Sequence, residues 1–420
     1  MLEQVEVYYN GWDERWLWGT LVSTTAITGR PQIVFEYSDE ARSRGLELSG
    51  YTLPLEGPRL RRGFAAHQLG LPGPVYDALP DGWGMLLMDR LFRRRQLNAA
   101  RIGPLERLAY IGNTAMGAMS FEPVAPEGLE PQAHVPIELL AAEILEVVQG
   151  DGGEFLHTLM RVGGSPQGAR PKALVYRDPE TGAFTTAATP GFEAWLIKFP
   201  AKGEHAEVCA IEMVYARCLR LCGIKTPDTQ HFILPNGLAA FASRRFDRIQ
   251  GKRVPMQSLA AFTGADYTSP GSLDYVNFLR ATQLCTNDVR EKAIAFERAV
   301  FNVAFNNRDD HPKNFAYLMS ASGSWTLAPA YDVTFCEGPG GYHQMDVLGE
   351  ALSIDRKAML RLAEEAEVSA EKAGGMIDGI CDVATQFAAI AEQTRPGLIT
   401  PETLAMLQAR IDENVALLRG

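Results

Sequence analysis

The sequence predicts an α+β fold of two lobes, in which a strand-rich first half is followed by a mostly helical C-terminal lobe. Short strand-like runs open the chain and recur between Gly163 and about Ala242, whereas the pattern becomes helical from about Arg248. The 420 residues are enough for two or three domains. We expect three parts: an N-terminal subdomain over residues 1–122, a second part over 123–247 and a helical lobe over 248–420.

The N-terminal subdomain is predicted to combine strands with a helix. Strand-like runs cover Val5–Tyr9, Leu17–Val22 and Gln32–Tyr37, and a helical pattern follows around Gly84–Arg95. Proline and glycine then concentrate in the segment Pro123–Pro136, which is typical of a linker or an exposed loop.

A glycine-rich segment, Val162–Lys172, leads into a short strand-like run in the second part. Its glycines include Gly163, Gly164 and Gly168, and glycine lets successive backbone N–H groups approach anionic oxygens closely. The segment is not a Walker A loop, because Lys172 is followed by alanine where that loop needs serine or threonine. A phosphate-binding loop and a plain turn both fit this pattern.

One lysine, Lys198, lies inside the strand-like run Ala194–Phe199. A charged group in an apolar strand costs free energy unless it meets solvent or a partner. The residue follows the glycine-rich segment and precedes a predicted helix, Ala206–Leu221, which is where a kinase lysine binds the α/β-phosphates. Glu207 or Glu212 of that helix could pair with it, and we favour Glu212, which is nearer mid-helix; the alternatives are a solvated edge strand and an ordinary surface glutamate.

The helical lobe contains a helix that delivers the chain to a cluster of polar residues. The helix is predicted over Asp288–Asn306, with apolar residues spaced for one face, at Ala293, Phe296, Val300 and Val303. The tail, Asp355–Leu418, is predicted to be helical apart from breaks near Gly374-Gly375 and Pro396.

The polar cluster combines an Asp-x-x-x-x-Asn spacing with a second acid downstream. Asp309 and Asn314 have this spacing, and Asp332 follows eighteen residues after Asn314. The intervening chain reads as a hairpin, with strands on either side of the serine- and glycine-containing turn 320–324. Such a hairpin would bring Asn314 and Asp332 side by side at its open end.

This set of groups is what phosphoryl transfer from ATP requires. One carboxylate orients or accepts the proton of the attacking hydroxyl, and a carboxamide oxygen with a second carboxylate holds Mg²⁺ against the phosphates. The spacing alone is also compatible with chance or with a solvated loop. The hairpin and Asp332 favour the catalytic interpretation.

Composition excludes several other classes of protein. The formal net charge of −11 does not fit an autonomous DNA-binding protein, which usually presents a basic face. The six cysteines form no Cys-x-x-Cys pair and are expected to be buried free thiols in a reducing cytoplasm, and the seven histidines lack metal-ligand spacing. We expect no membrane span and no secretory signal, because neither kind of apolar segment is visible.

The motifs resemble those of the HipA family of serine/threonine kinase toxins from HipBA-type toxin–antitoxin modules. The similarity rests on Asn307–Phe315 and Leu327–Asp332, which resemble the catalytic and metal-binding signatures of the family. Leu79–Gly84 is similar to the motif of its N-terminal subdomain, and Arg245–Arg248 to the segment after its hinge. The resemblance extends over nearly the whole chain and implies the two-lobed, protein-kinase-like HipA fold.

The resemblance also implies roles for individual residues. Asp309 would be the catalytic base, Asn314 and Asp332 the Mg²⁺ ligands, and His311 and Lys313 would shape the catalytic loop and contact phosphate. The remaining nucleotide contacts would come from Lys198, Gly163, Gly164, Gly168, Ala169, Arg244 and Phe246. Position 244 is often acidic in relatives and Ser258 stands where they often carry an acid, so the hinge departs from the family pattern.

Regulation and partners follow from the same resemblance. Ser165 matches a serine that becomes autophosphorylated in the family, which expels the glycine-rich loop from the nucleotide site. The expected partners are a HipB-like helix-turn-helix antitoxin, which would connect the chain to operator DNA, and an aminoacyl-tRNA synthetase substrate, glutamyl-tRNA synthetase first. The expected cofactors are ATP and Mg²⁺, and the expected location is the cytoplasm. The alternatives are a small-molecule phosphotransferase and a non-catalytic co-repressor.

Overall fold

The chain forms two compact units. The computed structural model describes residues 2–25, 31–125, 135–149, 156–163, 168–205, 207–235 and 237–420. The first unit comprises residues 1–204, 232–257 and 319–323, and the second comprises 205–231, 258–318 and 324–420. Both units are therefore built from separate stretches of sequence. The three-part division predicted from the sequence stays a prediction.

An antiparallel sheet of five strands opens the first unit. Its order is β4-β3-β2-β1-β5, and the three strand-like runs predicted from the sequence correspond to β1, β2 and β3. The strands span β1 Gln4–Tyr9, β2 Trp16–Thr25, β3 Pro31–Tyr37, β4 Leu60–Arg61 and β5 Met119–Glu122. On β1, Val5, Val7 and Tyr9 alternate inward and are buried, as expected for a sheet with one covered face.

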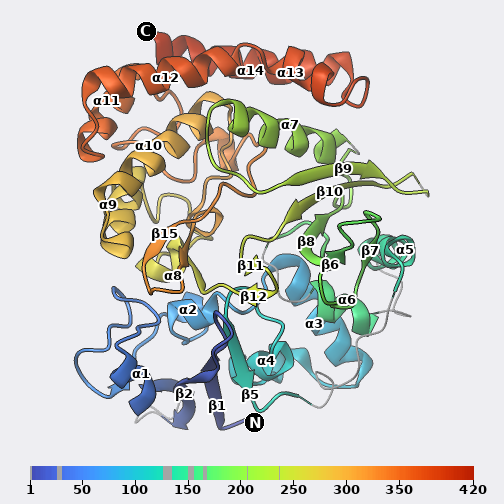
Figure 1. Cartoon of the computed structure of the whole chain (residues 1–420), viewed down its shortest axis with the longest axis vertical. Helices are drawn as coiled ribbons and strands as arrows, with labels where there is room; N and C mark the ends of the chain where they lie inside the picture. The colour runs from blue at the N-terminus through green and yellow to red at the C-terminus, as the bar shows by residue number, and fades with distance from the viewer. Residues whose placement is uncertain are drawn as a thin grey trace. The chain divides into compact units, whose positions relative to one another are not determined.

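Helices of the first unit lie beside its sheets (Figure 1). The predicted helix around Gly84–Arg95 is present as α3, Gly82–Arg94, and it packs against α6. Two helices, α5 and α6, were not predicted, because their sequences lie among the proline and glycine signals of the expected linker and loop. The helices are α1 Asp39–Arg44, α2 Gly73–Tyr76, α3, α4 Pro104–Ile111, α5 Ile137–Gln149 and α6 Leu156–Gly163.

A second five-stranded sheet, ordered β7-β6-β8-β10-β9, carries Lys198. Its strands are β6 Lys172–Arg177, β7 Phe184–Thr185, β8 Glu193–Lys198, β9 Thr229–Ile233 and β10 Ala239–Arg244. Strand β8 lies between β6 and β10, and Lys198 is only 6% exposed. The alternative of a solvated edge strand is therefore wrong. A buried ammonium group requires polar partners, and the predicted role of Lys198 in nucleotide binding stays a prediction.

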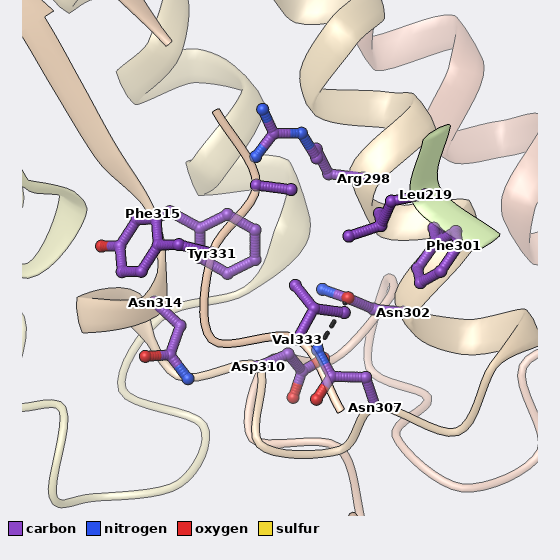
Figure 2. Close-up of a pocket in the computed structure, with 11 residues that line it drawn as sticks. Leu219, Arg298, Phe301, Asn302, Asn307, Asp310, Asn314, Phe315, Tyr331 and Val333 are labelled. Atoms are coloured by element: carbon purple, nitrogen blue, oxygen red, sulfur yellow. Dashed lines mark hydrogen bonds between the residues drawn. The ribbon is translucent and has the colours of Figure 1, made fainter. Parts of the chain in front are cut away.

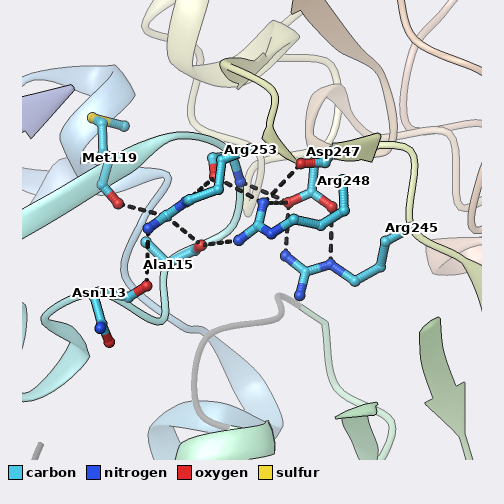
Figure 3. A network of polar contacts seen from close by, with 8 residues as sticks. Asn113, Ala115, Met119, Arg245, Asp247, Arg248 and Arg253 are labelled. Carbon is cyan, nitrogen blue, oxygen red and sulfur yellow. Dashed lines mark hydrogen bonds and ion pairs between the residues drawn. The ribbon is translucent and has the colours of Figure 1, made fainter. Parts of the chain in front are cut away.

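A buried ion-pair network ties a short hairpin to the loop before β5 (Figure 3). The hairpin consists of β11 Arg248–Ile249 and β12 Lys252–Arg253, and β13 Met256–Ser258 follows it. At its base, the Asp247 carboxylate accepts hydrogen bonds from Arg245 Nε (2.9 Å) and Nη2 (2.8 Å), from Arg248 Nη1 (2.8 Å) and from Gly117 N (2.8 Å). Asp247 is thus fully satisfied although it is buried.

Two arginines of this network, Arg248 and Arg253, also donate hydrogen bonds to backbone carbonyl oxygens. Arg253 donates to the carbonyl oxygens of Asn113, Ala115, Gly117 and Met119 at 2.7–3.0 Å. Burial alone would raise the pKa of Asp247, but the Arg245 and Arg248 guanidiniums beside it hold that pKa far below its usual range. Burial lowers the pKa of Arg253 to about 10, so this side chain keeps its charge at neutral pH.

The second unit is mainly helical and is organised around α10. The predicted helix over Asp288–Asn306 is present as α10, Val289–Ala304; Phe296, Val300 and Val303 are buried and Ala293 is partly buried. Figure 1 shows α11–α14 in red and orange on one side of this unit. Its other elements are α7 Glu207–Leu221, α8 Leu259–Thr263, α9 Tyr275–Thr286, β14 Ala316–Met319, β15 Trp325–Leu327, α11 Arg356–Glu365, α12 Ala370–Ala384, α13 Phe387–Thr394 and α14 Pro401–Arg419.

Of the two breaks predicted in the C-terminal helices, one is present and the other is not. The break at Pro396 is confirmed, because α13 ends at Thr394 and α14 begins at Pro401. The break at Gly374-Gly375 is wrong, since both glycines lie inside α12, which begins after the N-cap Ser369. Interior glycine costs a helix roughly 1 kcal/mol relative to alanine, and the packing of α12 on α10 and α14 offsets this cost.

All six cysteines are free, as expected, although only Cys209, Cys218 and Cys381 are fully buried. Within the residues that the structure describes, we find no helix with the length and apolar character needed to cross a bilayer.

Candidate active site

The candidate catalytic residues lie on a loop that leaves the C-terminal end of α10 and enters the hairpin β14–β15. The hairpin is formed as predicted, and Ala328 N donates to Ala316 O (2.8 Å) at its open end. A short 3₁₀ turn, Pro312–Asn314, joins the loop to β14. The two neighbouring acids on this loop differ sharply, because the side chain of Asp309 is 46% exposed and that of Asp310 is fully buried.

The surroundings of Asp309, the candidate base, raise its pKa. Its Oδ1 accepts a hydrogen bond from Gln344 Nε2 (2.7 Å) and lies 3.8 Å from His311 Nε2. Partial burial raises the pKa of Asp309, and the charges of Asp332 and Asp310 add to this rise; His311 and the Gln344 hydrogen bond act in the opposite direction. A carboxylate with a raised pKa accepts a proton more readily than an ordinary aspartate.

The hairpin brings Asn314 and Asp332 to this acid. Asn314 Nδ2 donates to Asp309 O (2.7 Å), so the carboxamide oxygen of Asn314 is left for another ligand. Asp332 is close enough for its charge to act on Asp309, and Tyr331 beside it donates from its hydroxyl to Lys313 O (2.6 Å). Asp332 has φ 55°, in the left-handed region, and such backbone conformations concentrate at functional sites.

The buried Asp310 carboxylate connects the loop to neighbouring elements through hydrogen bonds. Its Oδ2 accepts from the Tyr275 hydroxyl (2.8 Å) and contacts His343 Nδ1 (2.7 Å), and its Oδ1 accepts from Gln344 N (2.8 Å). The network continues from Tyr275 to Asn302 of α10, whose Nδ2 donates to the tyrosine hydroxyl (3.0 Å). Asp310 is therefore a structural acid that fixes the position of Asp309.

A pocket opens between this loop, α10 and the end of the hairpin (Figure 2). Asn314 and Asp310 line it at the lower end of the view, and Arg298 lies at the opposite end. Its lining is completed by Leu219, Phe301, Asn302, Asn307, Phe315, Ala330, Tyr331 and Val333. Asn307 Nδ2 donates to Asn302 Oδ1 (2.9 Å) across this pocket. The pocket lies behind the loop that carries the candidate catalytic residues, and its lining is both polar and apolar.

The segment after Asp332 is held along the catalytic loop by backbone contacts. Cys336 N donates to Asn306 O (3.1 Å), and Arg308 N donates to Cys336 O (3.2 Å). Arg308 itself is buried, and its guanidinium donates to Gly341 O. Through these contacts the segment delivers His343 and Gln344 to the two aspartates.

His311 and Lys313 flank the loop on the side of Tyr267. Lys313 is buried, with its Nζ 4.1 Å from the centroid of the Tyr267 ring, and the His311 ring lies 5.7 Å from the same centroid. A cation over an aromatic ring stabilises that geometry by roughly 0.5–2 kcal/mol. Their expected roles in shaping the loop and in contacting phosphate stay predictions.

The candidate nucleotide residues lie in the first unit. Lys198 is the direct cross-strand partner of Lys172, so both side chains are on one face of the sheet, and both are buried. Gly168 has φ +106°, and Ala169 follows it before β6. Gly163 is the last residue of α6, whereas Gly164 and Ser165 lie outside the described residues.

The hinge residues follow β10 in the same unit. Arg244 ends that strand with a half-exposed side chain, and its guanidinium is 3.2 Å from the Glu193 carboxylate. Phe246 is partly buried between the buried residues Arg245 and Asp247. Their predicted contacts with the nucleotide stay predictions.

Two family models match this chain. Residues 14–122 match the model of the HipA N-terminal domain, and residues 164–388 match that of the HipA-like C-terminal domain. The second match alone covers more than half of the chain. The chain belongs to the HipA family.

A solved HipA structure shows that the α+β fold of the family is present. HipA from Shewanella oneidensis MR-1, solved with HipB and its operator DNA, matches with a TM-score of 0.71 at 16% sequence identity, over 99% of this chain and 97% of that chain. A proinflammatory kinase from Helicobacter pylori, CtkA, is also similar, with a TM-score of 0.36 and 14% identity over 54% of this chain and 88% of that chain. The predicted HipA-type fold class is confirmed.

The sequence interpretation missed contacts of two polar residues, one in each unit. Lys172 was used only to exclude a Walker A loop, because its pairing with Lys198 depends on a strand register that a single sequence does not give. Gln344 lies in an irregular segment with no helical or strand pattern, and only the contacts of that segment with the catalytic loop bring it to Asp309.

Proposed function

We propose that the chain is an ATP-dependent serine/threonine protein kinase that acts as the toxin of a toxin–antitoxin pair. The observation that carries this proposal is the grouping of Asp309 with Asn314 and Asp332, in which a partly exposed carboxyl of raised pKa stands beside two oxygen ligands. This grouping has what in-line phosphoryl transfer needs, a base and a metal-binding pair.

Each residue of the grouping has a distinct role in the proposed reaction. Asp309 orients the attacking hydroxyl and accepts its proton. Asn314 and Asp332 would hold Mg²⁺, and they fit this role because the Asn314 amide nitrogen is already bound to Asp309 O and its oxygen is left for the metal. The ion would neutralise charge on the phosphates. Gln344 orients the base through Oδ1, and Asp310 fixes the loop.

Lysines of the second sheet would bind the phosphates of ATP. Lys198 and Lys172 are buried on one face, where two like charges repel each other and an anion placed between them would be stabilised. Gly168 and Ala169 would offer backbone N–H groups beside them. For the ion pair with Lys198 we favour Glu212, because the Glu207 carboxylate already accepts from Thr400 N (2.7 Å) and the Thr403 hydroxyl (2.7 Å).

The proposed biological context follows the family. The Shewanella HipA was solved with HipB and operator DNA, which supports a helix-turn-helix antitoxin as the partner of this chain and an indirect link to DNA. An aminoacyl-tRNA synthetase is the proposed substrate class, and Ser165 is the proposed autophosphorylation site. Phosphoserine would bring about −1.5 to −2 charges into a loop that binds phosphates, and the repulsion would weaken ATP binding.

Intact-mass measurement tests the kinase proposal directly. We expect the purified chain to gain one phosphoryl group when it is incubated with ATP and Mg²⁺, and we expect peptide mapping to locate it at Ser165. The Asp332→Ala variant should gain none, because Asn314 alone is a neutral ligand for a hard cation. Equal phosphorylation of both proteins would contradict the metal assignment. Phosphate transferred only to small molecules would instead favour the small-molecule phosphotransferase alternative.

The pH dependence of the reaction tests the role of Gln344. Its hydrogen bond lowers the pKa of Asp309, so Gln344→Ala should raise that pKa further. Because the base acts when deprotonated, the acid limb of the kcat/KM profile should move to higher pH. Gln386→Ala, which removes an exposed hydrogen bond of the same unit, serves as the control and should leave the limb in place. An identical shift in both variants would refute this role.

A further inference from the structure

The motif Leu79–Gly84 of the N-terminal subdomain has no role in the proposed reaction, yet it makes unusual contacts. Asp81 occupies the N-cap position of α3, where an aspartate normally accepts a hydrogen bond from its own helix. No such bond forms here. Its Oδ1 instead accepts from the backbone N–H of Gly168, 87 residues further along the chain.

The first turn of α3 binds the same residue a second time. Trp83 N, which has no acceptor within the first turn of its own helix, donates to Gly168 O (3.2 Å). The indole N–H of Trp83, which is buried, donates to Lys172 O (3.1 Å). Both backbone groups of Gly168 and the start of β6 are thus held by one helical turn. We call these contacts, made by Asp81 and Trp83, the α3 clamp.

Glycine at positions 82 and 168 allows this close approach. A Cβ on Gly82, whose φ is +31°, would lie 2.7 Å from Gly168 O and 2.8 Å from Ala169 Cα, which is closer than real carbon atoms come. A Cβ on Gly168, whose φ is +106°, would meet Lys172 Nζ. The Lys172 ammonium group therefore lies directly against the backbone that the clamp holds.

Helix α3 contacts the chain at both ends of the glycine-rich segment, but only the contacts at its C-terminal end belong to the α3 clamp. Helix α3 packs against α6, which ends at Gly163, and the α3 clamp holds Gly168 and Lys172. Lys172 stands opposite Lys198 in the sheet register. The position of one phosphate-binding lysine and of the loop end is thus determined by residues of the N-terminal subdomain.

We propose that Asp81 and Trp83 are positioning residues for nucleotide binding, acting through Gly168 and Lys172; this inference rests on the proposed function. The clamp contacts only residues of the first unit, whereas the proposed catalytic loop lies in the second unit. Loss of the clamp should therefore disturb the residues that bind ATP and not those that carry out the transfer. ATP affinity should therefore fall while the rate of the bound complex is retained. A merely structural motif would lower stability without separating KM from kcat.

The test compares variants of α3 in the full-length chain. Asp81→Ala should raise the KM for ATP and the Kd of ATP·Mg²⁺, measured by calorimetry, about tenfold, since a hydrogen bond to a charged group is lost. Asp81→Asn, whose amide oxygen still accepts from Gly168, should restore most of the affinity. Asp89→Ala is the matched control, because Asp89 lies on the same helix and pairs with Arg107 (2.8 Å) away from the loop; its ATP affinity should stay at the wild-type value.

Two further measurements keep the outcomes distinct. If Asp81→Ala does not fold, Trp83→Phe, which keeps an aromatic side chain but lacks the indole N–H that donates to Lys172 O, should still weaken ATP binding and speed hydrogen exchange in the peptide containing residues 168–172. Wild-type ATP affinity in Trp83→Phe and in any Asp81→Ala protein that folds, or a loss in Asp89→Ala equal to that of the clamp variants, would overturn the proposal. A wild-type chain that binds ATP but transfers no phosphate would refute the kinase function and leave the clamp testable by calorimetry.

Discussion

Replacing Asp309 with Asn should lower kcat for phosphoryl transfer about 10²–10⁴-fold, because a carboxamide cannot accept the proton of the attacking hydroxyl. The fold should survive, since the side chain is half exposed and its one hydrogen bond, from Gln344 Nε2, can be kept by an amide oxygen. Single-turnover phosphorylation measured with ATP and Mg²⁺ gives the rate, and thermal unfolding gives the stability.

The neighbouring acid supplies the control for this experiment. Asp310→Asn should destabilise the second unit by roughly 3–5 kcal/mol, because an NH₂ group would replace an acceptor that faces only the donors Tyr275, His343 and Gln344. The two adjacent substitutions should therefore have different effects. Asp309→Asn should lower kcat at normal stability, whereas Asp310→Asn should lower the free energy of unfolding. Normal turnover in Asp309→Asn would exclude it as the base.

Removing Asp247 should have the largest effect on stability in the first unit. Asp247→Ala leaves the guanidiniums of Arg245 and Arg248 without the buried carboxylate that they pair with, and breaking a buried pair in this way costs about 3–5 kcal/mol. Urea unfolding at pH 7 measures the loss. Asp13→Ala is the matched control, because Asp13 pairs with Lys252 of the same hairpin (2.8 Å) at an exposed position, where an ion pair contributes less than about 1 kcal/mol.

The pH dependence of this loss has a defined sign. The folded-state pKa of Asp247 lies far below that of an unfolded aspartate, so the acid contributes stability above about pH 4 that is lost as the pH falls. The difference in unfolding free energy between wild type and Asp247→Ala should therefore shrink from neutral pH toward acid. A difference that is constant with pH would mean that the charge of Asp247 does not contribute.

Local patterns were sufficient to predict much of the fold. The alternation of β1 and the apolar spacing of α10 each identify an element from a few neighbouring residues, and the serine- and glycine-containing turn at 320–324 predicts the β14–β15 hairpin in the same way. The sequence was misleading where packing outweighs local preference, as at Gly374-Gly375 inside α12. Helices α5 and α6 were missed because proline and glycine in the neighbouring segments dominated the local signal.

The catalytic loop could be predicted because Asp309 and Asn314 are neighbours in sequence and one hairpin joins them to Asp332. Gln344 and Lys172 reach their positions through long-range contacts and through strand register, and neither leaves a trace in a single sequence. The contrast between Asp309 and Asp310 was also hidden, because two identical side chains in sequence differ only in burial once the chain is folded.

That contrast has a consequence for genetics. If the chain inhibits growth as proposed, cells that escape it by mutation should fall into two groups. Changes at Asp309 should leave a normally abundant protein that can still occupy its antitoxin, whereas changes at Asp310, Tyr275 or His343 should remove the protein from the cell through unfolding and proteolysis. An immunoblot that measures the abundance of the protein in escape mutants would therefore distinguish catalytic from structural positions, even when they are adjacent in sequence, without an enzyme assay.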